Sequence, residues 1–404
     1  MKISFSPPRI DQKTIEEVKE TLLSGWITTG PKTKLFEDKL AKFIGVKEVV
    51  CLNSGTAGLQ MAMNWLGIKD GDEVIVPAYT YCATANVVLQ FGAKPIMVDI
   101  NLQDFNIDTS KIKKLITEKT KAIVGVDLAG FPADYIEIKK IVNTKEIRDL
   151  YNCENDIQKK LGRIAIISDA AHSIGAEYYG EKTGNHADMS SFSFHAVKNL
   201  TTAEGGALAL NLPDNFDEIK IKKYFKTLSV HGQSKDALTK NLAGSWEYDV
   251  IHPGFKCNMT DINAAIGLVE LDRYIETLKK RKDIFKLYDQ ILKTQKWAIL
   301  PIHEDQNKKS SCHIYMLRIK DCSEEQRNNI IIKMAQKEIA VNVHYKPLPM
   351  LTLYKKLNYN INDFPISYAC YSNEISLPVY YDLKFNEVEF VANSIISIIN
   401  EELK

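Results

Sequence analysis

Residues 49–67, VVCLNSGTAGLQMAMNWLG, predict a buried strand that leads directly into a helix. VVCLNS (49–54) is a short apolar run of strand length, and the residues after it change to a helical period. Four apolar residues share one helical face: Leu59, Ala62, Met63 and Leu66. A strand followed by an amphipathic helix is the repeating unit of α/β proteins.

The same alternation continues on both sides of this unit. Further short apolar strands are expected at EVIVP (73–77), PIMVDI (95–100), AIVGV (122–126), IAIIS (164–168), FSFHA (192–196) and ALALN (207–211). Helices are expected between them, at 83–91, 109–118 and 134–142. Strands that are β-branched and almost continuously apolar are typical of a parallel sheet with helices on both faces. The sequence therefore predicts an α/β fold with a mostly parallel sheet.

The pattern changes toward the C-terminus. A strand at 313–319, a helix at 324–338, a strand at 340–345 (AVNVHY) and a closing helix predict a smaller α+β unit. We therefore expect a large domain over residues 1–290 and a small one over 291–404. The charged segment 145–162 is expected to be a helical insertion that serves as a lid, an interface element or decoration.

Composition excludes several functional classes. The 404 residues include 52 basic and 51 acidic side chains, a net charge of +1, and 45% are hydrophobic. Such a balance is that of a folded globular protein, and it does not favour nucleic-acid binding. The apolar runs are of strand length, so no membrane span is expected. MKISFSPPRI at the N-terminus does not have the pattern of a signal peptide.

The cysteines indicate a reducing compartment. All seven are scattered, without CxxC spacing, which argues against a zinc site or a disulfide framework. We therefore expect a cytoplasmic protein without a metal centre.

Three segments that follow predicted strands could carry chemistry, because ligands of parallel sheets bind at the carboxyl ends of the strands. NSGTAG (53–58) opens a helix, and its Gly55, Thr56 and backbone N–H groups could hold a phosphate. Equally, Ser54 could simply cap the helix.

The second segment is SDAAH (168–172). Asp169 at a strand end could hold the protonated ring nitrogen of pyridoxal 5′-phosphate (PLP), or it could cap a short helix. His172 could orient this aspartate or contact the cofactor ring, or it could be a structural histidine.

The third segment, SFSFHAVKNLTTAEGG (191–206), places one lysine after a strand among small and hydroxyl-bearing residues. Lys198 could form a Schiff base if partial burial favours its neutral amine, and Ser193 could bind a phosphate oxygen. An isolated lysine is usually a surface residue. An anion cradle, an acid for the ring nitrogen and an amine on three strand ends are, however, the set that PLP requires.

An ordered series of motifs resembles the DegT/DnrJ/EryC1/StrS aminotransferases, PLP enzymes that act on nucleotide-linked keto-sugars. The series comprises WITTGP (26–31), SGTAGL (54–59), PAYTYCAT (77–84), VDLAG (126–130), SDAAHSIGA (168–176), SFSFHAVKNLTTAEGG (191–206), PGFKCNMTDINAAIG (253–267) and EISLPVY (374–380). The resemblance implies PLP-dependent transferase fold type I, similar to aspartate aminotransferase. Within the family the chain looks nearest to the branch that aminates UDP-4-keto-pentose.

The resemblance also implies roles for single residues. Lys198 would bond to the cofactor and then move the proton, while Asp169 would pair with the ring nitrogen and Tyr81 would stack on the ring. The phosphate would be held by Gly55, Thr56, Ser193 and, from the neighbouring subunit of a homodimer, Asn258. The substrate contacts implied are Thr29, His344 and Tyr345, although VHYKPLPMLTLY (343–354) departs from the pentose branch.

The expected reaction is transamination from an amino acid, glutamate in this family, to a UDP- or dTDP-linked 3-keto or 4-keto sugar in amino-sugar or cell-surface glycan biosynthesis. Two alternatives stay open. One is a PLP-dependent sugar dehydratase of the same fold, in which a histidine replaces the lysine, so that Lys198 counts against it. The other is a regulatory or binding protein that keeps the fold without turnover.

Overall fold

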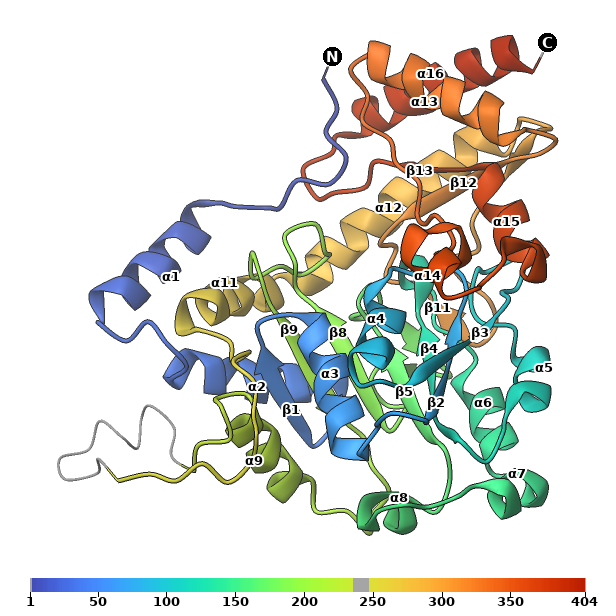
Figure 1. Ribbon diagram of the computed structural model, residues 1–404. Coiled ribbons are helices and arrows are strands. Elements are labelled where there is room, and N and C mark those ends of the chain that lie inside the picture. Colours follow the sequence, from blue (N-terminus) through green and yellow to red (C-terminus); the bar gives the residue numbers. More distant parts are fainter. Residues whose placement is uncertain (1, 235–246, 404) are drawn as a thin grey trace.

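A seven-stranded sheet forms the centre of the computed structural model, which describes residues 2–234 and 247–403 (Figure 1). Its strand order is β1-β9-β8-β5-β4-β2-β3, and β9 alone runs antiparallel to its neighbours. The strands are β1 (Glu48–Leu52), β2 (Glu73–Pro77), β3 (Lys94–Val98), β4 (Thr120–Val126), β5 (Ala165–Asp169), β8 (Met189–Ser193) and β9 (Gly206–Leu210). The predicted α/β fold with a mostly parallel sheet is confirmed.

Helices cover both faces of this sheet. One face packs against α3 (Gly55–Leu66), α4 (Ala83–Gln90) and α9 (Glu218–Leu228). The other face packs against α2 (Pro31–Ile44), α5 (Thr109–Ile112), α6 (Tyr135–Val142), α7 (Lys145–Leu150) and α11 (Asp261–Asp272). Within β1, Val50 and Leu52 point to the first face, whereas Val49 and Cys51 point to the second. Both sets are buried, which explains why the strands read as continuous apolar runs.

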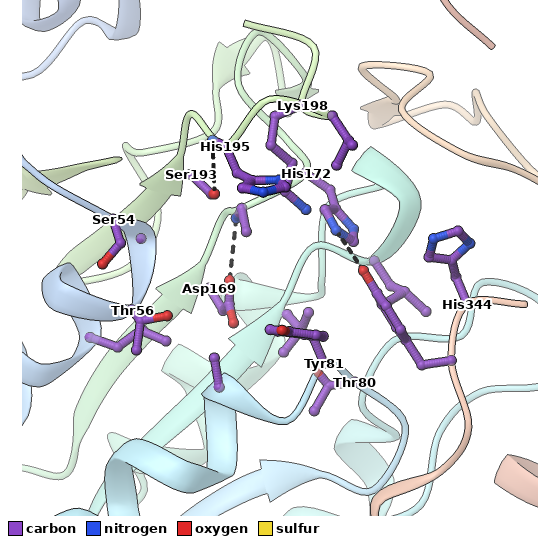
Figure 2. Close-up of a pocket in the computed structure, with 18 of the residues that line it drawn as sticks. Ser54, Thr56, Thr80, Tyr81, Asp169, His172, Ser193, His195, Lys198 and His344 are labelled. Atoms are coloured by element: carbon purple, nitrogen blue, oxygen red, sulfur yellow. Dashed lines mark hydrogen bonds between the residues drawn. The ribbon is translucent and has the colours of Figure 1, made fainter. Parts of the chain in front are cut away.

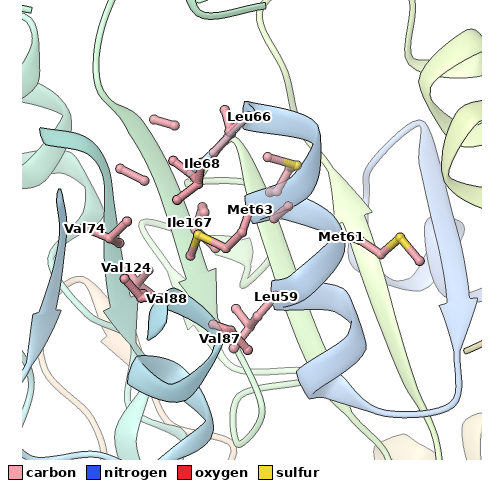
Figure 3. Packing of buried hydrophobic residues seen from close by; sticks show 14 of the residues in the cluster. Leu59, Met61, Met63, Leu66, Ile68, Val74, Val87, Val88, Val124 and Ile167 are labelled. Carbon is pink, nitrogen blue, oxygen red and sulfur yellow. The ribbon is translucent and has the colours of Figure 1, made fainter. Parts of the chain in front are cut away.

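Helix α3 shows how the opening stretch of sequence specifies this packing. Its apolar stripe, including Leu59, Met63 and Leu66, belongs to the same buried cluster as Ile167 of β5 and Val87 of α4, and Met63 lies beside Ile167 (Figure 3). Each such side chain stabilises the fold by about 1.5–3 kcal/mol through removal of apolar surface from water. The helix begins where the Ser54 hydroxyl accepts the N–H of Ala57 at 3.1 Å, so the predicted cap is present.

A second core forms beside the large sheet. It contains the last turns of α12 (Tyr274–Leu292) together with β12 (Tyr315–Ile319), α13 (Glu324–Gln336), β13 (Glu374–Leu377) and α16 (Phe385–Glu402). Strands β10 (Ala298–Ile299), β12 and β13 form its sheet. Ile3, near the N-terminus, is buried in this second core. Conversely, Leu348, Tyr354 and Phe364 pack into the core of the large sheet.

The remaining elements are helix α1 (Gln12–Leu23), which packs against α11, a small sheet of β11 (Lys308–Lys309), β6 (Glu177–Tyr178) and β7 (Glu181–Lys182), and short helices and turns. The short helices and turns are α8 (Asp156–Leu161), α14 (Thr352–Lys356), α15 (Pro365–Ser372) and the 3₁₀ turns η1 (Lys113–Leu115), η2 (Leu128–Gly130), η3 (Leu348–Met350) and η4 (Ile361–Asp363). No helix in the described part of the chain has both the length and the apolar character that crossing a membrane requires.

Two predicted strands need correction. AVNVHY (340–345) is not a strand: it makes one isolated bridge, from Asn342 to Ser376. The His344 backbone bonds to side chains instead of to strand backbone, since its N–H donates to Oε2 of Glu374 and its carbonyl accepts from the Tyr79 hydroxyl. The strand expected at 192–196 lies earlier, at 189–193, since the chain turns after Ser193 toward Lys198.

The charged insertion 145–162 forms α7 and α8 at the end of the sheet where β4 and β5 begin (Figure 1). Side-chain amides of Asn155 and Gln158 donate to the Leu66 carbonyl at the C-terminus of α3, at 3.0 and 2.9 Å. The Lys121 amine, at the start of β4, donates to the Asn152 carbonyl at 2.8 Å. The insertion thus anchors the end of α3 that is remote from the carboxyl ends of the strands, and this position excludes a lid over those ends.

Candidate active site

A cavity of about 360 Å³ opens at the carboxyl ends of the parallel strands (Figure 2). Loops after β1, β2, β4, β5 and β8 line it, and a segment from the C-terminal part of the chain closes one side. Nine of the residues singled out from the sequence line this one cavity: Gly55, Thr56, Tyr81, Asp169, His172, Ser193, Lys198, His344 and Tyr345. Residues that are up to 290 positions apart in the chain are therefore brought together by the topology that the strand pattern predicts.

The N-terminus of α3 points into one end of the cavity. Gly55 and Thr56 are its first residues, and their N–H groups have no partner within the helix. Glycine is needed here because a Cβ at Gly55 would lie 3.1 Å from the Phe192 carbonyl oxygen, and one at Gly206 would lie 2.3 Å from the Gly55 nitrogen. The close approach of the backbones sets Ser193 of β8 beside the helix start. This end of the cavity can bind an anion through backbone N–H groups and two hydroxyls.

Asp169, the last residue of β5, is buried at the floor of the cavity. The Thr84 hydroxyl donates to its Oδ2 at 2.8 Å, and the Ala171 N–H donates to its Oδ1 at 3.3 Å. Burial raises the pKa of this carboxyl, while Thr84, the Ala171 N–H and the charge of Lys198 oppose that shift. The hydrogen bonds hold the carboxylate in one orientation and stabilise its charged form.

Lys198 lies in the loop between β8 and β9, where its backbone N–H donates to the His195 carbonyl at 2.8 Å. Desolvation lowers the pKa of its amine to about 8, and the nearby Asp169 charge limits the shift. A lysine with this pKa carries a substantial neutral fraction near physiological pH. It is therefore able to act as a nucleophile and as a base.

His172 and Tyr345 form a hydrogen-bonded pair across the cavity wall. The Ala129 N–H donates to Nδ1 of His172 at 3.2 Å, so Nδ1 carries a lone pair. Desolvation and the charge of Lys198 lower the pKa of His172 well below its ordinary value, which leaves the ring neutral with its proton on Nε2. That Nε2–H lies 3.1 Å from the Tyr345 hydroxyl oxygen and donates to it. The hydroxyl proton of Tyr345 is thereby left to donate elsewhere.

His344 and Tyr345 belong to the segment that was expected to be a strand. Long-range contacts hold it instead: the Tyr79 hydroxyl donates to the His344 carbonyl at 2.8 Å, and Phe5 stacks on the His344 ring with centroids 5.4 Å apart. Tyr345 also approaches Tyr81, with ring centroids 5.8 Å apart. This wall of the cavity is thus assembled from the N-terminus, the loop after β2 and the C-terminal part.

Thr29 and Asn258 lie outside this cavity. The Asn258 side-chain amide donates to the Thr29 hydroxyl at 2.7 Å, and Thr29 in turn donates to the Met259 carbonyl. They are close to each other but do not line the space that contains Lys198.

The sequence pattern of the DegT/DnrJ/EryC1/StrS aminotransferase family matches residues 8–396 of the chain. The chain belongs to this family. The matched residues include every strand of the large sheet and every residue that lines the cavity, so the family membership applies to both the fold and the candidate site.

Three relatives of this aminotransferase illustrate the range of the family. Spr1654 of Streptococcus pneumoniae, described as a sugar aminotransferase, is 44% identical, and its PLP-form structure matches with a TM-score of 0.95 over 100% of both chains. The spore coat polysaccharide biosynthesis protein SpsC of Bacillus subtilis is 33% identical over 98% of this chain and 97% of its own. The UDP-4-amino-4-deoxy-L-arabinose–oxoglutarate aminotransferase of Shewanella sediminis is 32% identical over 98% of this chain and 97% of its own. The last two relatives are almost equally similar to this chain, so their sequence identities do not indicate which sugar this chain uses as its substrate.

Three residues in or behind the cavity wall of this aminotransferase were not predicted individually: Thr80 and Glu204 line the cavity, whereas Thr84 is fully buried and is not part of the lining. Thr80 and Thr84 both come from PAYTYCAT (77–84). The Thr84 hydroxyl donates its proton to Asp169, so in the 2.9 Å contact between the two threonines Thr80 is the donor and Thr84 the acceptor. Glu204 lies in the loop after Lys198 and lines the cavity as well. Hydroxyl residues that directly follow a parallel strand are the signal that could have indicated the threonines.

Proposed function

We propose that this aminotransferase uses PLP to move an amino group from glutamate to a nucleotide-linked keto-sugar, in amino-sugar or cell-surface glycan biosynthesis. The observation that carries the proposal is the shared cavity of Lys198, Asp169 and the N-terminus of α3. These groups offer an amine, a buried carboxylate and an anion site in one space.

The donor set fits this cofactor. The cavity volume of about 360 Å³ falls in the range of small-molecule sites. Gly55, Thr56 and Ser193 would hold the phosphate, Asp169 would bind the ring nitrogen, and the exposed ring of Tyr81 would cover one ring face. When bound, PLP supplies an aldehyde that exchanges with amines and a ring that accepts electron density from the substrate carbon.

Lys198 is the residue that transfers protons in this proposal. Because burial holds its pKa near 8, its Nζ is able to receive a proton from the substrate carbon and give it back on another atom. Asp169 fixes positive charge on the ring nitrogen, since it is buried and already oriented by Thr84. His172 would lie against the second ring face, held by its bond to Ala129.

The sugar would bind at the wall formed by His344 and Tyr345. Both line the cavity, and the Tyr345 hydroxyl has a proton to donate after accepting from His172. Support for a nucleotide-linked keto-sugar comes from the name of the Shewanella sediminis relative, an aminotransferase of UDP-4-amino-4-deoxy-L-arabinose and oxoglutarate. The proposal leaves open whether the nucleotide carrier is UDP or dTDP and whether the keto group is at C3 or C4 of the sugar.

We further propose a homodimer in which Asn258 and Thr29 complete the neighbouring subunit's site. Their position beside each other and outside this chain's own cavity supports such a role. Apolar side chains exposed on and after α1 offer a surface for association: Ile15, Leu22, Leu23 and Ile27. Light scattering that gives a monomer would contradict this part of the proposal.

Two organisational proposals accompany the function. The small domain that closes on the cavity starts near residue 290, within α12, and includes the N-terminal residues around Ile3. The cytoplasm is the compartment we propose, because all seven cysteines are free thiols.

The function is tested by spectroscopy and product analysis. Protein loaded with PLP should show a visible absorption band that disappears when glutamate is added, with release of 2-oxoglutarate. A panel of UDP- and dTDP-linked 3- and 4-ketoses is then screened by mass spectrometry for an aminated sugar. Loss of the band with glutamate but no aminated sugar would refute the substrate class, and the absence of any band would refute the cofactor.

A further inference from the structure

A chain of hydrogen bonds leads from the cavity wall into the interior of the second core, the one that contains β12 and β13. Nδ1 of His344 lies 2.8 Å from the Ser376 hydroxyl oxygen. Ser376 in turn lies 2.5 Å from Oε1 of Glu374. The other carboxylate oxygen, Oε2, accepts the backbone N–H of His344 at 3.0 Å. Glu374 therefore contacts the backbone of His344 directly and the ring of His344 through Ser376, and these contacts fix the geometry of the three groups.

Burial separates the two ends of this chain. Glu374 and Ser376, on β13, have no exposed surface, whereas His344 lines the cavity that holds Lys198 (Figure 2). Within the described residues, Nε2 of His344 has no hydrogen-bond partner, so it is free to meet a ligand. Other titratable or charged groups surround these three hydrogen-bonded residues. Near His344 they are Lys198, His172 and His313. Near Glu374 they are Arg327, Tyr79, Tyr345 and Cys370.

Two proton arrangements satisfy every contact in the chain. With Glu374 ionised, Ser376 donates to Glu374, the Nδ1–H of His344 donates to Ser376, and Nε2 has a lone pair. With Glu374 protonated, Glu374 donates to Ser376, Ser376 donates to Nδ1, and Nε2 carries the proton. The two arrangements differ by one proton, and the imidazole is neutral in both.

We propose that His344, Ser376 and Glu374 form a proton relay through which Nε2 of His344 binds or releases a proton at the cavity wall without becoming an imidazolium. When Nε2 gains a proton, the Nδ1–H bond breaks and its proton passes to the Ser376 oxygen. The original hydroxyl proton of Ser376 passes at the same time to Oε1 of Glu374. The charge that disappears is that of the buried carboxylate.

Electrostatics favour the relay over an ordinary histidine base. Desolvation and the nearby charge of Lys198 lower the pKa of His344 to about 3, so a cationic ring is strongly disfavoured there. Burial raises the pKa of Glu374 to about 8, which allows the carboxyl to accept a proton at neutral pH. The relay thus combines a neutral group at the cavity with a proton acceptor that water does not reach.

The use of the relay rests on the proposed function. Exchange of an amine with a carbonyl removes two protons from nitrogen and places two on the oxygen that leaves as water. The relay takes one of these protons from the nitrogen and passes it to the oxygen, and it ends in its starting state. His344 is then a second proton-transfer residue, on the opposite wall from Lys198.

The relay itself is tested in cofactor-free protein, so that failure of the proposed function does not affect the result. Nitrogen-15 NMR of histidine side chains shows which ring nitrogen carries the proton, and a His344→Gln variant assigns the signals. Wild-type His344 should change from the Nε2–H to the Nδ1–H form as pH rises through about 8, because Glu374 loses its proton there. It should not form the imidazolium in this range.

Glu374→Gln provides the sharpest comparison. Its amide oxygen can accept the His344 N–H while its NH₂ donates to Ser376, so His344 should stay in the Nε2–H form at every pH. Ser376→Ala interrupts the chain and should also abolish the pH-dependent change, which keeps the test open if the first variant does not fold. Matched controls are Glu218→Gln, a buried carboxylate that accepts the Leu212 N–H, and Ser190→Ala, a buried serine of β8.

Both controls should keep the wild-type behaviour of His344. A single tautomer across pH 6–9.5 in wild type, or an unchanged transition in Glu374→Gln or Ser376→Ala, would overturn the relay. If the relay is present but the amination of keto-sugars changes less than about twofold in Glu374→Gln, its use in the reaction is overturned and the tautomer result stands.

Discussion

The two walls of the cavity are built in different ways. One wall lies at the carboxyl ends of the large sheet and is called the large-domain wall: Gly55 and Lys198 follow strands of this sheet and Asp169 ends one, so local sequence and topology place them. On the opposite wall, His344 and Tyr345 lie outside any strand and depend on partners from distant parts of the chain, including Phe5 and Tyr79. We therefore expect that substitutions on one wall alter cofactor binding and substitutions on the other alter sugar binding.

Lys198→Ala should have the largest effect. It removes the only amine that we assign to the reaction, so transamination should fall by more than about 10³-fold, because acid–base and covalent roles are lost together. The visible band of the PLP-loaded protein should also be absent. Lys220→Ala, an exposed lysine on α9, is the control and should leave both unchanged. Retained turnover in Lys198→Ala would place the chemistry elsewhere.

Asp169→Asn should follow, with a loss of about 10²–10³-fold in turnover, because a neutral amide no longer stabilises a protonated ring nitrogen. The charge of Asp169 is also what raises the pKa of Lys198 against desolvation. In wild type, attachment of PLP to Lys198 should accelerate as pH rises through about 8, and in the variant this transition should move to lower pH. A transition at unchanged or higher pH would contradict the electrostatic coupling.

Tyr345→Phe changes the opposite wall. The Nε2–H of His172 loses its acceptor, and the substrate loses a hydroxyl donor, which costs about 1–3 kcal/mol, or roughly five- to 150-fold in the half-reaction with the keto-sugar. The half-reaction with glutamate and the affinity for PLP should change much less. Tyr359→Phe, whose hydroxyl bonds to the Pro95 carbonyl, is the control. Equal losses in both half-reactions would mean that the two walls do not act separately.

Thr84→Val removes the hydrogen bond to Asp169 and keeps the shape of the side chain. Turnover should fall by about fivefold, in keeping with roughly 1 kcal/mol for one buried hydrogen bond. Because the Thr84 bond lowers the pKa of Asp169, the carboxyl should protonate at a higher pH in the variant. The acid limb of the pH–rate profile should therefore move upward, and an unmoved limb would show that Thr84 does not tune Asp169.

Phe5→Ala should have the smallest effect. Loss of the ring stacked on His344 costs about 0.5–1.5 kcal/mol, so the KM for the keto-sugar should rise about two- to tenfold. PLP affinity should not change. A change in PLP affinity alone would contradict the assignment of Phe5 to the sugar wall.

The sequence predicted the large-domain wall well for a physical reason. A strand that ends at Asp169 or a helix that starts at Gly55 is specified by neighbours within a few residues, and parallel strands place their carboxyl ends at one edge. The opposite wall depends on contacts that local patterns do not contain. AVNVHY (340–345) has the apolar content of a strand, but Tyr79 and Glu374 bind its backbone, and each is distant in sequence. The pairing of Thr84 with Asp169 could not be predicted either, because it joins the first turn of α4 to the last residue of β5, 85 positions apart in the sequence.

The central claim is that Lys198 and Asp169 define a PLP site on the large-domain wall. It is tested most directly by incubating the protein with PLP, reducing the complex with borohydride and mapping the modified peptide by mass spectrometry. We expect one stoichiometric modification on Lys198, which glutamate added before reduction prevents. Modification at other lysines, or no modification at all, would contradict it.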